Sequence, residues 1–275
     1  EAAVRVGVVG TGWVATDRYL PALSRSRGAA VAAVCSGSSA EAANAAERFG
    51  VPRSFEQLDD FLREPLDAVV VCTPPGSHAA IVESALRADK HVLVEKPMTL
   101  TAEEGQGLER LAEERGLVLC PAHNFLFSRS TARAEKALRS GEAGDVQGAM
   151  GLQLSSSRRR LPSWSGELPG GLFFDEAPHL LYLMRRFLGE LTVEDAWHSP
   201  PTSSADVFER REARLAGEHG VAQLSMWLGS PLSEWLFALV CSRQVLVLDL
   251  FRDLLITLPG ERAHDTRDVL RSATA

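Results

Sequence analysis

The sequence has few cysteines, and none of them stands in a pairing pattern. Its four cysteines end or lie inside apolar runs: Cys35, Cys72, Cys120 and Cys241. In such runs cysteine behaves as a small buried residue. No Cys-x-x-Cys pair and no cysteine–histidine cluster has the spacing of metal ligands. We therefore expect no disulfide framework, no metal site and a reducing, cytoplasmic setting.

Long apolar runs and an excess of positive charge are also absent. No run approaches the roughly 18 residues of a membrane span. Residues 1–10 lead directly into an expected strand, so we expect no signal peptide, although the missing initiator methionine fits a trimmed start. The chain has 29 Lys and Arg against 36 Asp and Glu, a net charge of −7. Its one dense basic run is residues 158–160. Binding to a membrane or to nucleic acid is therefore not expected.

The first part of the chain alternates short apolar runs with helical stretches. The expected strands are Val4–Val9, Ala30–Cys35, Ala68–Cys72, His91–Val94 and Leu117–Cys120. The expected helices are Val14–Ser26, Ser39–Phe49, His78–Ala88 and Ala102–Glu114. Runs that are apolar throughout indicate strands covered on both faces, as in a parallel α/β sheet. With 275 residues, two domains are expected, and residues 1–122 form a Rossmann dinucleotide-binding domain.

The second part has the texture of an α+β domain. Strands are expected at 146–156, 191–198, 207–214, 219–228, 234–242 and 244–258. Turn residues separate them, which favours an open, mostly antiparallel sheet. One helix is expected, Pro178–Leu188, and residues 158–171 read as a polar loop. Residues 123–275 are therefore predicted to bind substrate and to mediate oligomerisation.

A glycine loop joins the first strand to the first helix. Gly10, Gly12 and Ala15 follow the GxGxxG/A pattern, in which the glycines allow a tight turn and a close approach to a pyrophosphate. The loop residues expected to touch the dinucleotide are Gly10, Thr11, Gly12, Trp13 and Val14. Pro21 is expected to end or kink the helix early.

The end of the second strand lacks the carboxylate that usually holds a ribose 2′-hydroxyl. Ser36 stands there, and no acidic residue follows until Glu41. Ser36 and Ser38 are able to hydrogen-bond a 2′-phosphate, although Gly37 stands where an arginine would help. We therefore expect NADP as the cofactor in preference to NAD.

The turns after the expected strands Ala68–Cys72 and His91–Val94 face the same edge of the sheet, because the carboxyl ends of parallel strands line the ligand crevice. Thr73, Pro74 and Pro75 end one strand, and Glu95, Lys96 and Pro97 end the other. We expect these turns to line the nicotinamide half of a cofactor site. His78 either begins a helix and caps it or contacts the cofactor.

Asp175 and His179 stand four residues apart at the start of the expected second-domain helix. If helical geometry reaches back to Asp175, the two share one face. The helix N-terminus then favours an anionic Asp and a neutral His, the form that a general base needs. The alternative is that Asp175 caps the helix and His179 packs nearby.

Four segments together resemble the Gfo/Idh/MocA family, that of glucose–fructose oxidoreductase and inositol dehydrogenase. They are "GVVGTGWVATDRYLPAL", "VVVCTPPGSHAAIVESALRADKHVLVEKP", "PAHNFLFSRS" and "WSGELPGGLFFDEAPHLLYLMRRFLG". The resemblance implies a Rossmann domain followed by an open sheet, with nicotinamide and substrate meeting between them. Two departures are Pro169, where the family has a third glycine, and an end at "DTRDVLRSATA", before the family's C-terminal helix.

The resemblance also implies roles for particular residues. Lys96, Asp175 and His179 match the family's catalytic positions, and Asn124 matches a position beside nicotinamide and substrate. Lys96 would stabilise the reacting oxygen and His179 would move the proton. Trp164 and Arg158 or Arg160 lie in the expected substrate loop, whereas the arginine run also fits a solvated loop. Glu176 either faces solvent or binds a substrate hydroxyl.

The sequence thus predicts an NAD(P)-dependent oxidoreductase of a sugar, nucleotide-sugar, inositol or similar polyol. Two alternatives remain open: an NAD-dependent glycosidase of the same fold, and a non-catalytic dinucleotide sensor. The sensor is disfavoured because Lys96, Asp175 and His179 are all present. A homo-oligomer that packs through the second-domain sheet is expected.

Overall fold

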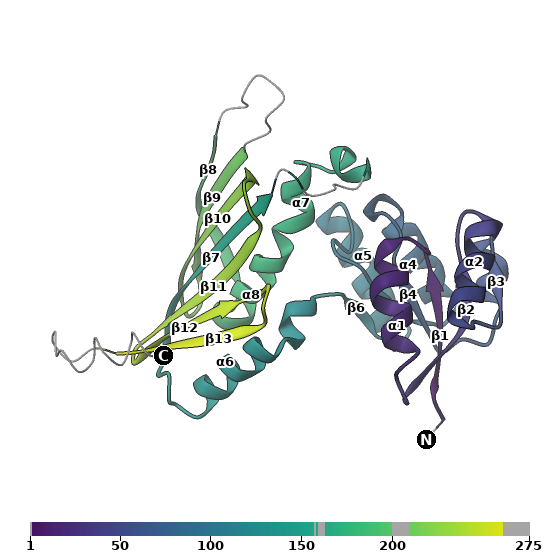
Figure 1. Ribbon diagram of the computed structural model, residues 1–275, viewed down its shortest axis with the longest axis horizontal. Helices are drawn as coiled ribbons and strands as arrows, with labels where there is room; N and C mark the ends of the chain where they lie inside the picture. The colour runs from purple at the N-terminus through teal and green to yellow at the C-terminus, as the bar shows by residue number, and fades with distance from the viewer. Residues whose placement is uncertain (1, 157, 159–162, 200–208, 261–275) are drawn as a thin grey trace. The chain divides into compact units, whose positions relative to one another are not determined.

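The computed structural model describes residues 2–156, 158, 163–199 and 209–260. It divides into two compact units (Figure 1). The first comprises residues 1–122 with 166–169, and the second comprises residues 123–165 with 170–275.

The first unit is built on a six-stranded parallel sheet with the strand order β3-β2-β1-β4-β5-β6. Its strands are β1 (Val4–Val9), β2 (Ala29–Cys35), β3 (Ser54–Phe55), β4 (Ala68–Val71), β5 (His91–Val94) and β6 (Leu119–Pro121). This is the Rossmann order, and it confirms the predicted fold class. The two-residue strand β3 was not predicted.

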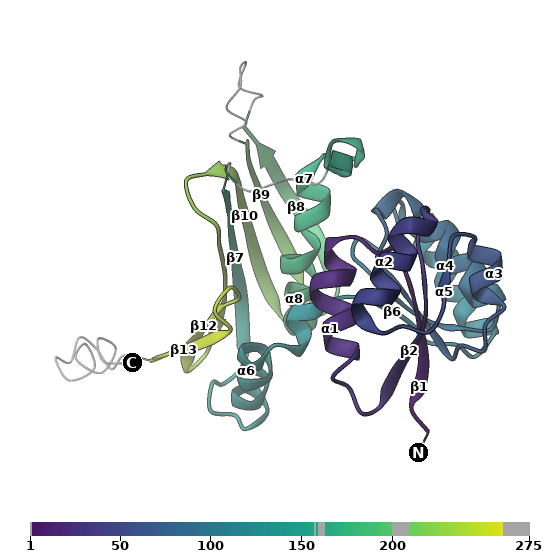
Figure 2. The same ribbon diagram turned by 45° about the vertical axis from the view of Figure 1, so that its right-hand side comes forward.

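Helices cover both faces of this sheet (Figures 1 and 2). One core packs against α1 (Leu20–Leu23) and α2 (Ser39–Phe49). The other packs against α3 (Leu58–Leu62), α4 (His78–Arg87) and α5 (Ala102–Glu114). Two buried faces explain why these strands are apolar throughout instead of alternating.

The first helix is less regular than the sequence predicts. It begins with a π-helical turn, η1 (Ala15–Tyr19), in which the Leu20 N–H donates to the Ala15 carbonyl, and then continues as α1. Pro21 stands in the first turn of α1, where a missing N–H costs least. Pro21 thus coincides with the change of helix type, and the helix ends at Leu23.

The second unit is built on a seven-stranded sheet with the order β13-β12-β11-β7-β10-β9-β8. Its strands are β7 (Val146–Ser156), β8 (Leu191–His198), β9 (Glu209–Gly217), β10 (Gly220–Ser230), β11 (Glu234–Cys241), β12 (Gln244–Asp249) and β13 (Leu254–Pro259). Only β7 and β10 pair in parallel among these described strands; the other pairs are antiparallel. The single strand predicted at 244–258 is two strands, because the chain turns at residues 250–253.

Helices α6 (Arg129–Arg139) and α8 (Pro178–Leu188) share one apolar core with this sheet. Figures 1 and 2 show α8 lying along one face, and no described element of this unit covers the opposite face. The sequence predicted α8 with these bounds but missed α6, whose polar composition hid its short apolar stripe. Among the described residues, no helix is both long and apolar enough to cross a membrane.

Candidate active site

The turn after β1 requires glycine. Gly10 has φ +90°, and a Cβ there would lie 2.8 Å from the backbone carbon and oxygen of Cys72. A Cβ on Gly12 would meet no atom within 4 Å. The chain therefore turns tightly at Gly10 and leaves open space over Gly12. This is the space that a dinucleotide pyrophosphate needs, so the loop fits the cofactor. Trp13 is 63% exposed beside it, and Thr11 and Val14 complete the loop.

The end of β2 carries a carboxylate that the sequence does not place there. Ser36 Oγ donates to Glu41 Oε2 at 2.9 Å, although Glu41 lies in the first turn of α2. Ser38 is the N-cap of that helix and accepts from the Glu41 N–H. The expectation of NADP rested on a missing carboxylate, and this hydrogen bond removes that basis.

The turns after β4 and β5 are tied together by His78. Its buried ring contacts the Pro97 carbonyl through Nδ1 at 2.8 Å and the Thr73 carbonyl through Nε2 at 2.7 Å. His78 is fully buried, so its ring supports the two turns instead of offering itself to a ligand. Ser77 further fixes Thr73 through a hydroxyl bond of 2.8 Å. Pro74 is exposed beside them, and Pro75 is buried.

Glu95 holds the backbone at the end of β5. Its carboxylate accepts from the Tyr19 hydroxyl at 2.8 Å and from the Lys96 backbone N–H at 3.1 Å. Burial, and then the Glu95 charge, raise the pKa of the Tyr19 phenol, so this hydroxyl stays protonated as a donor. Glu95 thereby fixes the position from which the Lys96 side chain starts, and the Lys96–Pro97 peptide bond is cis.

Helical geometry in the second unit reaches back to Asp175. The short helix α7 (Leu172–Glu176) joins α8 through Ala177, whose φ of −55° and ψ of −34° are helical. Asp175 and His179 therefore lie on one helix face, as the sequence analysis required for a shared site. Both side chains are buried.

Tyr182, which the sequence analysis did not single out, holds the His179 ring. Its hydroxyl lies 3.1 Å from His179 Nδ1, donates to Asn124 Oδ1 at 3.1 Å and accepts from the Phe125 N–H at 3.1 Å. His123 stacks on the Tyr182 ring at 4.3 Å. The signal available in the sequence was the spacing, since Tyr182 stands three residues after His179 on the same helix.

Two further aromatic rings, those of Phe125 and Trp235, pack against His179. The ring centroid of Phe125 lies 5.2 Å from that of His179, in an edge-on arrangement, and the ring centroid of Trp235 lies 4.7 Å from it. His179 is thus oriented by Tyr182 and restrained by apolar neighbours, an arrangement suited to a positioned proton donor or acceptor.

Glu176 does not face solvent, in contrast to one of the two expectations for it. It is 2% exposed and accepts hydrogen bonds from Ser155 Oγ, at 2.6 Å, and from Gln153 Nε2. Both partners lie on β7. This cluster fastens α7, which carries Asp175, to the central strand of the sheet.

The expected substrate loop is only partly described. Trp164 is half-buried in a 3₁₀ turn, Ser163–Glu167, and Arg158 is exposed, with its N–H donating to Ser156 Oγ. Arg160 and residues 261–275, which include the expected start of a C-terminal helix, lie outside the described residues. Within the described ranges, no group of three or more His, Cys, Asp and Glu side chains is suited to hold a metal ion.

Comparisons with known proteins agree with this architecture. Residues 4–123 match the Gfo/Idh/MocA family model, described as an oxidoreductase family with an NAD-binding Rossmann fold. The dTDP-3,4-didehydro-2,6-dideoxy-alpha-D-glucose 3-reductase of Streptomyces violaceoruber is 39% identical over 200 residues, which are 70% of this chain and 57% of that protein. A reductase of the same name from Saccharopolyspora spinosa is 36% identical over 218 residues, 74% of this chain and 62% of that protein. The chain thus spans less than two thirds of the length of these relatives.

Solved structures extend the similarity to both units. The 3-ketoreductase KijD10 of Actinomadura kijaniata, in complex with TDP-benzene and NADP, has a TM-score of 0.77 and 26% identity, covering 100% of this chain and 89% of that chain. Levoglucosan dehydrogenase, in complex with NADH and levoglucosan, has a TM-score of 0.82 at 20% identity, covering 96% of this chain and 78% of that chain. The second match speaks for the fold alone.

Proposed function

Because this chain belongs to the Gfo/Idh/MocA family through its Rossmann domain, residues 4–123, we propose that it is an NAD(P)-dependent oxidoreductase of a sugar. The observation that carries the proposal is the turn at Gly10, where no Cβ fits, beside the open backbone at Gly12. Such a loop after the first strand of a Rossmann sheet is built to receive a dinucleotide. The Tyr182-held imidazole of His179 adds a group suited to move a proton.

The proposed substrate is a nucleotide-linked keto sugar. Relatives named as dTDP-sugar 3-reductases support this choice, as does the KijD10 structure with its TDP ligand. Other sugars and polyols are the broader class from which the substrate is drawn. Arg158 and Trp164 are proposed substrate contacts, since an arginine binds phosphate and an aromatic ring packs on a sugar.

The bound dinucleotide supplies the hydride acceptor or donor, and the chain's own residues handle the oxygen and the proton. The Lys96 ammonium stabilises negative charge that develops on the reacting oxygen. His179 donates or accepts the proton, and Asp175 orients His179 or a substrate hydroxyl. Asn124 positions the substrate, while Thr73, Pro74 and Pro75 form a rigid wall for the nicotinamide. Glu95 supports Lys96 through the backbone.

The test is the full-length protein incubated with a dTDP-linked keto sugar and reduced dinucleotide carrying deuterium at the transferable position. We expect dinucleotide oxidation, and mass spectrometry should find deuterium on the sugar carbon. Turnover of a glycoside without net dinucleotide consumption would instead favour the glycosidase alternative. Dinucleotide binding with no turnover of any sugar in a broad panel would favour the sensor.

A further inference from the structure

The second strand of the first unit ends beside the glycine turn. Cys35 pairs with Val9, and the Gly10 N–H donates to the Cys35 carbonyl at 2.8 Å. Side chains that follow Cys35 therefore lie next to the loop that holds the pyrophosphate in the proposed function. The adenosine ribose is bonded to that pyrophosphate, so Ser36 and its neighbours are the groups that it meets.

Glu41 brings its carboxylate back to this position from the next helix. Ser38 caps α2 by accepting from the Glu41 N–H, and this fixes the first turn. Side chains on a helix lean toward its N-terminus, which here is the end of β2. Ser36 Oγ donates to Glu41 Oε2 at 2.9 Å. Ser36 is 8% exposed, whereas Glu41 is exposed, so the carboxylate remains accessible.

The segment around this carboxylate carries no compensating cation. Residues 36–41 read Ser-Gly-Ser-Ser-Ala-Glu, with no lysine or arginine. A ribose hydroxyl donates a hydrogen bond to a carboxylate, whereas a 2′-phosphate has only acceptor oxygens and about two negative charges. A 2′-phosphate bound beside Glu41 would therefore be repelled by its carboxylate.

We propose that Glu41 selects NAD(H) over NADP(H), by accepting a hydrogen bond from the adenosine ribose and repelling a 2′-phosphate. The inference rests on the proposed dinucleotide site and reverses the preference expected from Ser36 alone. It also explains how a Rossmann strand without a terminal acidic residue obtains one: the carboxylate comes from five residues farther along the chain.

The test compares wild type with Glu41→Gln, which keeps the shape and an acceptor oxygen but removes the charge. Glu47→Gln is the matched control. Glu47 is exposed on the same helix, so this substitution removes the same charge at a position away from the end of β2. Dissociation constants for NADH and NADPH are measured by calorimetry in the absence of sugar. We expect wild type to bind NADH at least about tenfold more tightly than NADPH, from the charge repulsion.

Glu41→Gln should remove most of the preference for NADH, chiefly by lowering the dissociation constant for NADPH. Glu47→Gln should leave the ratio of the two dissociation constants unchanged. Added salt should bring the wild-type dissociation constants for NADH and NADPH closer together, because salt screens the repulsion between Glu41 and the 2′-phosphate. Equal or tighter binding of NADPH by wild type overturns the inference, as does an equal effect of the two substitutions. If Glu41→Gln does not fold, the wild-type ratio decides, with Ser36→Ala as the second variant. Failure to bind either dinucleotide would overturn the proposed function as well, whereas equal binding of both overturns this inference alone.

Discussion

Lys96 stands at the end of β5, where Tyr19 and Glu95 fix the backbone from which its side chain leaves. Replacing Lys96 with Ala removes the ammonium proposed to stabilise the reacting oxygen. We expect kcat to fall by about 10²–10³-fold, the typical loss for one such donor, with much less change in the Kd for NADH. Lys90→Ala is the control, since Lys90 flanks the other end of β5 and donates to the Leu66 carbonyl. Near wild-type kcat in Lys96→Ala would end its catalytic assignment.

The Tyr182 hydroxyl has one proton, and that proton goes to Asn124 Oδ1. A neutral His179 then donates through Nδ1 to the Tyr182 oxygen and keeps its lone pair on Nε2. Tyr182→Phe keeps the ring that stacks on His123 but removes this constraint. We expect kcat to fall by about tenfold or more, a part of the usual general acid–base contribution, with a smaller change in KM.

The pH dependence of kcat distinguishes this role from a purely structural one. Loss of the tautomer constraint should alter the limb of the profile that reports His179, whereas simple destabilisation lowers the whole profile without changing its shape. A Tyr182→Phe profile that superimposes on wild type after scaling would contradict the assignment.

The sequence predicts a residue's place along the chain better than its side-chain partners. Asp175 and His179 were expected to share a face if helical geometry reached back to Asp175, because four residues in a helix make about one turn. The Ser36–Glu41 bond was missed, because it needs the cap at Ser38 and the direction of a side chain from the next element. The solvent-facing position considered for Glu176 was wrong for a similar reason: its partners, Gln153 and Ser155, come from a strand more than 20 residues earlier.

At the scale of elements, the β1–η1 turn separates the effects of two glycines. Gly10→Ala places a Cβ against the Cys72 backbone at a positive φ, so we expect unfolding free energy to fall by at least about 1–3 kcal/mol. Gly12→Ala has room for its Cβ in the protein alone, so stability should change little while dinucleotide affinity is lost. Thermal unfolding and calorimetric binding of both variants check this, and equal loss of stability would contradict it.

Helix α6 begins under the β12–β13 turn, where Asp253 accepts from the backbone N–H groups of Arg129 and Ser130. Burial opposes its charge, but hydrogen bonds from Ser130 and Arg129 outweigh burial and hold the pKa of Asp253 below its usual range. A depressed folded-state pKa gives stability that is present above the unfolded pKa of about 3.9 and is lost as pH falls through the folded value.

Asp253→Asn keeps one acceptor oxygen and tolerates the positive φ of 53°. We expect it to lower the unfolding free energy by about 1 kcal/mol at pH 7, as for the loss of a helix cap. The difference should begin to shrink as pH falls below about 4 and should disappear only below the folded-state pKa. Asp89→Asn is the control, since Asp89 also has a positive φ but its side chain is 77% exposed. A difference that persists unchanged in acid, measured by denaturant titration, would contradict the charge-based explanation.

Strands of the first sheet, which helices cover on both faces, were the easier elements to predict. The mainly apolar strands β1 and β5 appear with their predicted bounds. Strands β12 and β13 were harder to predict as separate strands, because the turn between them, at residues 250–253, contains neither glycine nor proline. Asp249 supplies the turn instead, by accepting from the Phe251 and Arg252 N–H groups.

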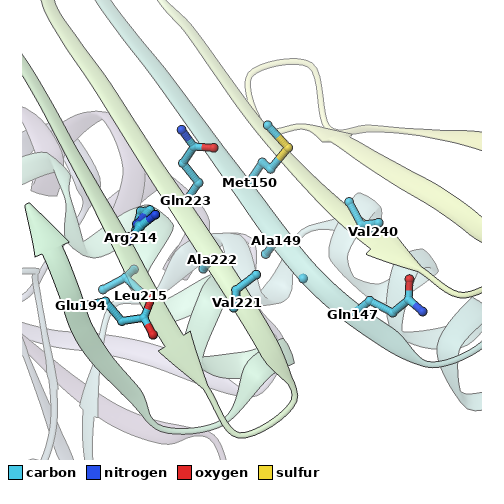
Figure 3. Close-up of a pocket in the computed structure, with 11 residues that line it drawn as sticks. Gln147, Ala149, Met150, Glu194, Arg214, Leu215, Val221, Ala222, Gln223 and Val240 are labelled. Carbon is cyan, nitrogen blue, oxygen red and sulfur yellow. The ribbon is translucent and has the colours of Figure 1, made fainter.

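At the scale of the whole molecule, the second sheet offers one face with no described covering element. A pocket of about 430 Å³ lies on it, and Met150, Val221, Arg214, Glu194 and Gln223 are among the residues that line it. Figure 3 shows these side chains. Met150 is 53% exposed and Val221 is 62% exposed. Apolar residues flanked by one cation and one anion suit a self-complementary interface, in which the charges of two copies pair instead of repelling.

We therefore expect a homo-oligomer that packs this face on a second copy, and Met150→Lys should shift it toward monomer. Val118→Lys is the matched control, because Val118 is an exposed apolar residue, at 59%, in the first unit. Light scattering on the full-length protein over a range of concentrations is the measurement. A wild type that stays monomeric, or assembly unaffected by Met150→Lys, would contradict the assignment of this face.

The fold class followed from the sequence, because strand composition reports how many faces are buried. Runs without alternation indicated the parallel sheet, and strands separated by turn residues indicated the antiparallel one. The roles of Lys96, Asp175 and His179 remain predictions, since a backbone pattern places residues at an edge or on a face but does not select a substrate.

Among the described strands, β7 pairs only with strands that are synthesised after it. This strand, residues 146–156, lies between β10, residues 220–230, and β11, residues 234–241. Its two neighbours are therefore synthesised some 65–95 residues later, so the centre of the second sheet has no partner until they emerge from the ribosome. The parallel strands of the first unit are complete by residue 121. During synthesis, the dinucleotide-binding unit can thus fold early. Until β10 and β11 are made, both edges of β7 lack their native partners, and unpaired strand edges are prone to aggregate with other chains.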